Sequence, residues 1–269
     1  MDASQTRNGR IYEHKSTIFM NRAFIRRQSS LPCTAMEIQQ ITVGPFEVNC
    51  TILWENQPNA LVIDPGTDAE AIQAVLQKNN LTVAAYLLTH GHADHINALA
   101  ELHGAHPAPV YMHPADQEWA FGENNQIPPY YPVPAKPGCE ILDPTNPPRP
   151  AGTPPQEGTC ENMRPNAVGS KVWKISGLSF QTLETPGHTP GGVCYWFKEA
   201  GVCFVGDTLF KGSAGRTDLP GGDARTLTAS LKKLAETLPP ETRIIAGHGD
   251  DTTMVHELAT NFFLQRFQS

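Results

Sequence analysis

Three absences narrow the function of this 269-residue sequence. No apolar run approaches the roughly 20 residues of a membrane-spanning helix, so no membrane association is expected. Basic residues are not in excess, since the net charge is −7, which argues against a nucleic-acid-binding surface over the whole molecule. The six cysteines form no CxxC pair, which argues against a zinc ribbon or a thioredoxin-like motif. No feature implies a protein partner, and without a secretory signal a cytoplasmic, reducing compartment is expected.

The first 35 residues differ from the rest. They contain six basic and two acidic residues, a balance of +4, with no acid from Ile18 to Ala35. Such an Arg- and Ser-rich, acid-poor segment is typical of an organellar transit peptide, which would place the protein in a mitochondrial or plastid matrix. The alternative is an upstream start codon, with Met36 as the natural beginning. In either case we expect residues 1–35 to form a poorly ordered extension and residues 36–269 to form the folded domain.

From Met36 onward the apolar pattern predicts an α/β fold. Hydrophobic residues make up 39% of the chain, which is enough to bury a core. Helical spacing of apolar residues follows Asp68 and Asp223, which are the expected N-caps, and recurs at 254–267. Strand-like runs lie at 37–43, 48–54, 60–63, 84–88, 110–113, 172–175, 178–184, 193–197, 202–205 and 243–246. This order favours two sheets covered by helices in a layered sandwich.

Proline interrupts this regularity. Residues 128–165 contain 12 of the 24 prolines, and runs such as 144–155 hold neither a helix nor a central strand. We therefore expect a long surface insertion at about residues 122–168, partly polyproline II in character. It would serve as a lid, as a partner-binding segment or as a tolerated surface loop.

Chemically capable side chains gather directly after apolar strands. Because strand ends at one edge of a sheet present ligands on a rigid scaffold, these side chains are candidates for one site. They are His90, His92 and His95 after the run at 84–88, His188 after 178–184, Asp207 after 202–205 and His248 after 243–246.

The spacing His90-x-His92-x-Asp94-His95 predicts two metal sites. In extended backbone, residues i and i+2 point the same way, so His90 and His92 would bind one metal together. Asp94 and His95 fall where the chain turns into a helix, which directs them elsewhere. His188 would complete the first set and His248 the second, with the carboxylate of Asp207 as a bridge. Nitrogen and oxygen ligands without thiolates suit zinc first, and also iron or manganese.

This ordered set resembles the metallo-β-lactamase superfamily over about residues 36–260, without the insertion. The resemblance implies a four-layer αββα sandwich with the metals at one edge of the sheets. It implies that Asp64, after the strand at 60–63, supports a ligand by a hydrogen bond without binding metal. Metal 1 would be bound by His90, His92 and His188, and metal 2 by Asp94, His95 and His248, with Asp207 between them.

Within that superfamily the run from Gly206 to Phe210 and the run from Gly215 to Asp223 resemble the glyoxalase II group, the hydroxyacylglutathione hydrolases. The resemblance implies that Arg216 contacts the glutathione part of the substrate. The alternative for Arg216 is an ion pair with Asp218 or Asp223. The full-length members of the group have a helical C-terminal region with further basic residues, and this chain ends about 20 residues after His248. A wider thioester range than glutathione conjugates therefore stays open.

The expected reaction is hydrolysis of S-acyl glutathione-type thioesters. Two divalent cations would hold a bridging water and lower its pKa, so that hydroxide attacks the acyl carbonyl, with Asp94 as the group that takes the proton. One alternative is a persulfide dioxygenase, which the run Gly215-Arg216-Thr217-Asp218 also resembles and which uses one iron on His90, His188 and Asp207. The others are β-lactam, lactone or phosphodiester hydrolysis and a non-catalytic binding module.

Overall fold

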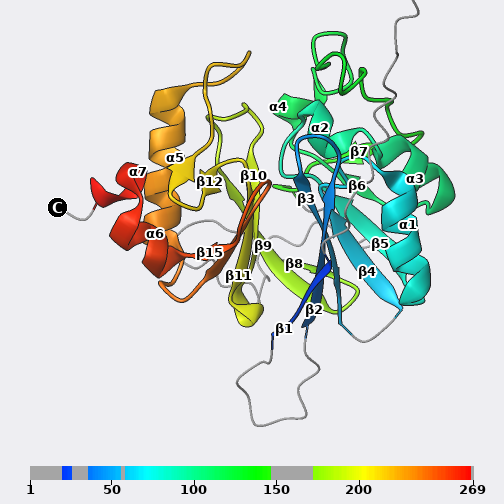
Figure 1. Cartoon of the computed structure of the whole chain (residues 1–269), viewed down its shortest axis with the longest axis horizontal. Helices are drawn as coiled ribbons and strands as arrows, with labels where there is room; N and C mark the ends of the chain where they lie inside the picture. Colours follow the sequence, from blue (N-terminus) through cyan, green and yellow to red (C-terminus); the bar gives the residue numbers. More distant parts are fainter. Residues whose placement is uncertain (1–19, 26–35, 56–57, 147–171, 268–269) are drawn as a thin grey trace, which may run out of the picture.

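The computed structural model describes residues 20–25, 36–55, 58–146 and 172–267, whose strands form two large sheets and one two-stranded pair. The two large sheets lie side by side in the middle of the molecule (Figure 1). The first has the order β1 (Met20–Ile25), β2 (Met36–Val43), β3 (Val48–Trp54), β4 (Asn59–Ile63), β5 (Thr82–Leu87), β6 (Val110–Tyr111) and β7 (Ile141–Leu142). The second has the order β15 (Thr252–Thr253), β14 (Arg243–Ala246), β11 (Val202–Gly206), β10 (Val193–Phe197), β9 (Leu178–Glu184) and β8 (Val172–Ile175). The small pair is β12 (Leu209–Phe210) with β13 (Ser213–Ala214).

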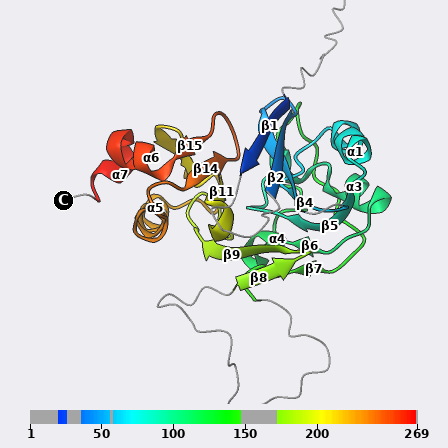
Figure 2. The ribbon, with the colours of Figure 1, turned by 90° about the horizontal axis from the view of Figure 1, so that it is seen from below.

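Helices cover the outer face of each sheet (Figures 1 and 2). Two of them, α1 (Ala69–Lys78) and α3 (Leu99–Ala105), cover the first sheet. The second sheet is covered by α5 (Ala224–Thr237), α6 (Met254–Thr260) and α7 (Phe262–Gln265). Two single-turn helices, α2 (Ala93–Ile96) and α4 (Pro114–Gln117), follow β5 and β6.

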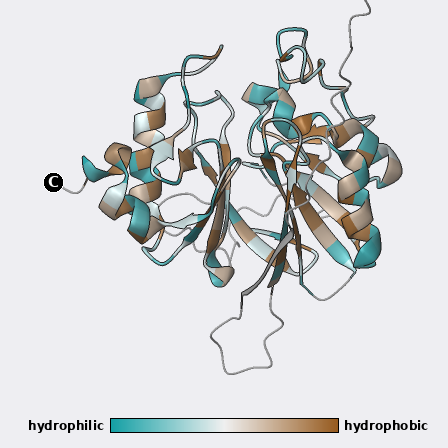
Figure 3. Cartoon of the chain, in the orientation of Figure 1, coloured by the Kyte–Doolittle hydropathy of each residue, from teal (hydrophilic) through white to brown (hydrophobic). Residues whose placement is uncertain are grey.

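Three clusters of buried apolar side chains hold these layers together. The middle cluster lies between the two sheets, where Leu53 and Leu87 pack with Phe180 and Tyr195. The two outer clusters pack α1 and α3 on one sheet and the leucine stripe of α5 on the other. Hydrophobic residues are accordingly concentrated on the strands and on the inward sides of the helices (Figure 3). The predicted αββα sandwich is confirmed.

The two expected helix caps differ in outcome. Asp223 caps α5 as predicted, because its Oδ1 accepts a 2.6 Å hydrogen bond from the Thr226 amide. Asp68 precedes α1, but it has a φ of +57° and makes no capping bond. Its carboxylate instead accepts a 2.9 Å bond from the Gly44 amide, which ties the β2–β3 turn to the start of α1. Asp68 thus stands at the predicted N-cap position, but its side chain does not cap the helix.

Two boundaries also differ from expectation. Within the extension expected to be poorly ordered, Met20–Ile25 forms β1 and pairs antiparallel with β2; the other residues of 1–35 lie outside the described ranges. The Pro-rich insertion is not wholly a surface loop: Tyr131 is 2% exposed and Ile141 belongs to β7, which pairs with β6. Prolines lie between Tyr131 and Ile141 in the sequence, but they do not prevent these two side chains from being buried. Residues 147–171 lie outside the description.

The strand directions bring the candidate residues to one edge. β11 and β14 are parallel, and β10 is antiparallel to both β9 and β11, so β9, β11 and β14 run the same way. Their carboxyl ends therefore meet at the same edge, and the loop after β5 reaches that edge from the other sheet, where the amide of Val193 donates to the Thr89 carbonyl at 2.8 Å. Among the described residues, no helix has the length and apolar character to cross a membrane.

Candidate metal centre

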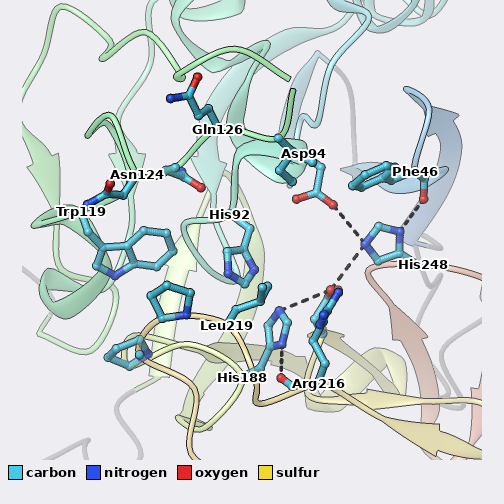
Figure 4. A pocket seen from close by; sticks show the side chains of 16 residues that line it. Phe46, His92, Asp94, Trp119, Asn124, Gln126, His188, Arg216, Leu219 and His248 are labelled. Carbon is cyan, nitrogen blue, oxygen red and sulfur yellow. Dashed lines mark hydrogen bonds and ion pairs between the residues drawn. The ribbon is translucent and has the colours of Figure 1, made fainter. Parts of the chain in front are cut away.

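The structure brings all seven predicted ligand residues together at this edge. His90 and His92 lie in the loop after β5, Asp94 and His95 on α2, and His188, Asp207 and His248 after β9, β11 and β14. The side chains lining the larger cavity at this edge, with His92, His188 and His248 around its floor, are shown in Figure 4. The strand ends thus bring the predicted ligand residues to one place.

The side chains form two groups. His90, His92 and His188 can place one ligand atom each within 4.8 Å of one another, and their ring centroids are 4.6–5.0 Å apart. Asp94, His95 and His248 meet the same criterion. A third set, Asp64 with His90 and His95, also meets it, but Asp64 already accepts hydrogen bonds from Thr89 and His95.

Asp207 lies between the two groups. Its Oδ2 is 3.5 Å from His188 Nε2 in the first group and 3.4 Å from His248 Nε2 in the second, while its Oδ1 is 3.5 Å from His95 Nε2. This is the position that a bridging carboxylate requires.

Hydrogen bonds on the far side of the rings fix which nitrogen faces the site. His188 Nδ1 is 2.8 Å from the carbonyl oxygen of Arg216, and His248 Nδ1 is 2.7 Å from the carbonyl oxygen of Phe46. Since a carbonyl only accepts, each Nδ1 carries the proton and donates it, which turns the Nε2 lone pair toward the centre. The same logic applies to His95, whose Nδ1 is 3.1 Å from Asp64 Oδ2.

Asp64 supports the centre from beneath. It is 2% exposed and accepts from the amide of Thr89 at 2.8 Å and from the hydroxyl of Thr89 at 2.6 Å, besides the bond from His95. The Thr89 oxygen is also 3.0 Å from His90 Nδ1. One carboxylate thus orients a histidine of each group, the role that the resemblance implies for Asp64.

The two groups differ in charge when metal-free. Burial, together with the neighbouring positive charge of His95, holds the pKa of His90 well below its usual range, and burial lowers the pKa of His92 to about 4. Burial alone would also lower the pKa of His248, but hydrogen bonds to Asp207 and Asp94 raise it to about 11. Burial opposes ionisation of Asp207, yet the charge of His95 holds the pKa of Asp207 well below its usual range. His90 and His92 are therefore neutral, whereas the second group is an ion-pair cluster.

Unpaired buried atoms test whether this set fits a cation. His90 Nε2, His188 Nε2 and Asp207 Oδ1 are buried and have no hydrogen-bond partner. An unsatisfied buried polar group costs about 1–3 kcal/mol. All three atoms are lone-pair donors at the centre of a site without thiolates, so the set fits a hard or borderline divalent ion such as zinc, iron or manganese.

Glycine makes room for this crowding. A Cβ at Gly247 would overlap Asp207 Oδ1 and lie 2.7 Å from His95 Cε1. Gly206 has a φ of +50°, and a Cβ there would overlap the hydroxyl of Thr89. The positions of Asp207 and of Thr89, which donates to Asp64, therefore both require glycine, which has no Cβ, at 247 and 206.

One supporting residue escapes the sequence prediction. Asp116 on α4 is fully buried, and its Oδ2 accepts from the Gly91 amide at 2.9 Å and from the Thr189 hydroxyl at 2.8 Å, while its Oδ1 accepts from the Gly191 amide at 2.7 Å. It joins the loop of His90 and His92 to the loop of His188. Burial raises its pKa. No motif marks this acid, because its partners are backbone amides that only the fold brings near.

Arg216 lines the cavity but is paired. Its guanidinium donates two 2.7 Å hydrogen bonds to the carboxylate of Asp218, the alternative that the sequence leaves open. The bonds from Arg216 lower the pKa of Asp218 to about 2. The backbone carbonyl of Arg216 has a separate part in the site, since it orients His188.

Residues 43–248 match the family model of the metallo-β-lactamase superfamily. This chain belongs to that superfamily. The hydroxyacylglutathione hydrolase GloC of Haemophilus influenzae is 34% identical over 229 residues, which cover 85% of this chain and 98% of that protein. The match spans nearly the whole relative, so the similarity is not confined to the metal-binding motif.

Two solved structures have the same fold. The BLEG-1 B3 metallo-β-lactamase is 35% identical with a TM-score of 0.69, and it covers 84% of this chain and 99% of its own. TTHA1623, solved in a di-iron-bound form, is 36% identical with a TM-score of 0.65 and the same coverage. The fold is thus shared with a protein named as a B3 metallo-β-lactamase and with one solved with two iron ions.

Proposed function

We propose that this protein is a metal-dependent hydrolase of S-acyl glutathione-type thioesters. The observation that carries the proposal is the completeness of the second group, where His248 Nε2 lies 3.4 Å from Asp94 Oδ2 and 3.2 Å from His95 Nε2. Hydrolysis by two metals needs both groups, whereas a mononuclear dioxygenase needs only His90, His188 and Asp207. The similarity to GloC supports the thioester, and Arg216 on the cavity wall is the proposed contact for the glutathione moiety.

The residues divide the work as follows. His90, His92 and His188 would hold one divalent ion and Asp94, His95 and His248 the other, with Asp207 bridging. When bound, two such ions supply hydroxide at neutral pH and polarise the acyl carbonyl. Asp94 has a 9% exposed side chain on the cavity wall and, because of the charge of His95, a lowered pKa despite its burial. It is therefore an ionised base placed to accept the nucleophile's proton.

The direct test is thiol release from S-D-lactoylglutathione by purified, metal-loaded protein, with His92→Ala as the matched control. We expect the thioesterase activity of His92→Ala to be more than about 100-fold lower. Loss of a residue that only supports a metal ligand already lowers metal affinity or activity by about 10–100-fold. If the unaltered protein releases no more thiol than His92→Ala, the proposal is wrong.

A further inference from the structure

The metal centre opens into two cavities that differ in the charged side chains on their walls. A larger one of about 790 Å³ and a smaller one of about 470 Å³ share His188, Asp207, Arg216 and His248. A thioester has two arms on either side of its reacting carbonyl. A carbonyl at the shared residues would therefore send one arm into each cavity.

Apolar side chains dominate the wall of the larger cavity. Trp119 stands beside the metal ligands, with its ring centroid 5.5 Å from that of His92. Leu219 lies on the same side of the view, and Phe46 lies across the cavity beside His248 (Figure 4). Phe46 is 38% exposed and Ile127 is half-buried, so this apolar surface faces the opening. Asn124 and Gln126 add uncharged amides.

Free positive charge is missing from this wall. Among the described lining residues Arg216 is the one lysine or arginine, and Asp218 already neutralises it. Apart from the metal ligands, the described part of this wall therefore offers a substrate carboxylate no unpaired lysine or arginine. The wall is suited to an uncharged apolar group, which gains free energy in proportion to the apolar area it buries.

The smaller cavity is also lined by apolar side chains, among them Phe210 and Ala214, but its wall carries an ion pair in addition. Lys211 and Asp250 line it as an ion pair at 3.0 Å, together with Ser213 and the shared Arg216. Exposed pairs of this kind are weak and exchange partners readily. This side suits a charged peptide-like thiol such as glutathione.

Resting on the proposed function, we infer that the larger cavity receives the acyl group and selects thioesters whose acyl group carries an aromatic ring. The smaller, charged cavity takes the thiol arm. Apolar pockets discriminate by about 10–200-fold for one methylene, so a whole ring gives a preference of at least about tenfold.

The substrate test uses S-lactoylglutathione and S-phenyllactoylglutathione, which differ by one phenyl ring and share the thiol. We expect kcat/KM at least tenfold higher for the phenyllactoyl ester. Equal or lower kcat/KM for the phenyllactoyl ester overturns the inference alone. Absence of thiol release from every thioester overturns the proposed function and this inference with it.

The residue test uses Trp119→Ala, with Leu219→Ala as a second variant on the same cavity. In each, the ratio of kcat/KM for the two esters should fall about tenfold with metal content unchanged. Trp119→Phe should retain most of the ratio, and Phe262→Ala, 78% exposed on α7, should not change it. If Trp119→Ala and Leu219→Ala both leave the ratio intact, the larger cavity does not hold the acyl group.

A binding measurement needs no turnover. The thioethers S-phenethylglutathione and S-methylglutathione cannot be hydrolysed. Calorimetry of the metal-loaded protein should show at least tenfold tighter binding of the phenethyl compound, and Trp119→Ala should remove most of that difference. Equal affinities for the two thioethers would contradict the inference.

Discussion

The two ligand groups of the metal centre differ in how they exist without metal. In the first group, His90 and His92 are neutral, and the Nε2 atoms of His90 and His188 are buried without a hydrogen-bond partner. The second group neutralises itself, because Asp94 and Asp207 surround His95 and His248. The contact of 3.2 Å between His95 Nε2 and His248 Nε2 requires a proton on one of them. The first group is therefore prepared for a metal, whereas the second must exchange a proton for one.

The largest expected effect comes from removing a first-group ligand. His188→Ala should lose metal from the first group and lose more than about 100-fold in thioesterase kcat/KM, because no other described side chain can replace its Nε2. Metal analysis together with thiol release measures this. Retention of full metal content would contradict the assignment of His188 to the first group.

Asp116→Asn should lower the metal affinity of the first group without changing any of its candidate ligands. An asparagine presents its NH₂ to at least one backbone amide that now donates to Asp116, so either the Gly91 or the Gly191 contact fails. We expect about 10–100-fold weaker metal binding at the first group. Circular dichroism and a metal competition titration separate this from unfolding.

Asp64→Asn is the matched variant for the other group. It removes the carboxylate that accepts from His95 Nδ1, so we expect the larger loss at the second group, again within about 10–100-fold. If Asp64→Asn and Asp116→Asn weaken the same ion to the same degree, the two groups are not supported separately.

The pH dependence of metal affinity should also differ between the two groups. The pKa of His248 is raised to about 11, so between pH 7 and 9 a metal must displace a proton there, and its affinity should rise about tenfold per pH unit. The pKa of His92 is lowered to about 4, so above pH 6 a metal has no proton to displace from His92, and its affinity at the first group should change less with pH. Titrations of the two ions at pH 6, 7 and 8 measure this, and parallel slopes would contradict it.

The smallest expected effect is that of Arg216→Met. Its guanidinium is an exposed pair with Asp218, and such pairs contribute about 0–1 kcal/mol. We expect a less than tenfold change in kcat/KM, confined to KM, because the carbonyl that orients His188 belongs to the backbone and remains. Steady-state kinetics on one glutathione thioester measures it, and a large loss in kcat would show a greater role.

The clustering of the candidate ligands could be predicted from the sequence, because each follows an apolar strand and strands of one direction end at one edge. His188 and His248 are 60 residues apart in sequence, yet the same pattern marks both. Asp116 could not be predicted, because its partners are amides of distant loops. The burial of Tyr131 could not be predicted either, because the prolines around it indicate a restricted backbone and say nothing about burial.

The most direct test of the two-group account is the metal content of the purified protein, measured on the same sample as thiol release under nitrogen. The account predicts about two divalent ions per chain and thioester hydrolysis that does not depend on oxygen. One iron per chain, no thiol release and oxygen uptake with glutathione persulfide would contradict it and leave His248 without a catalytic part.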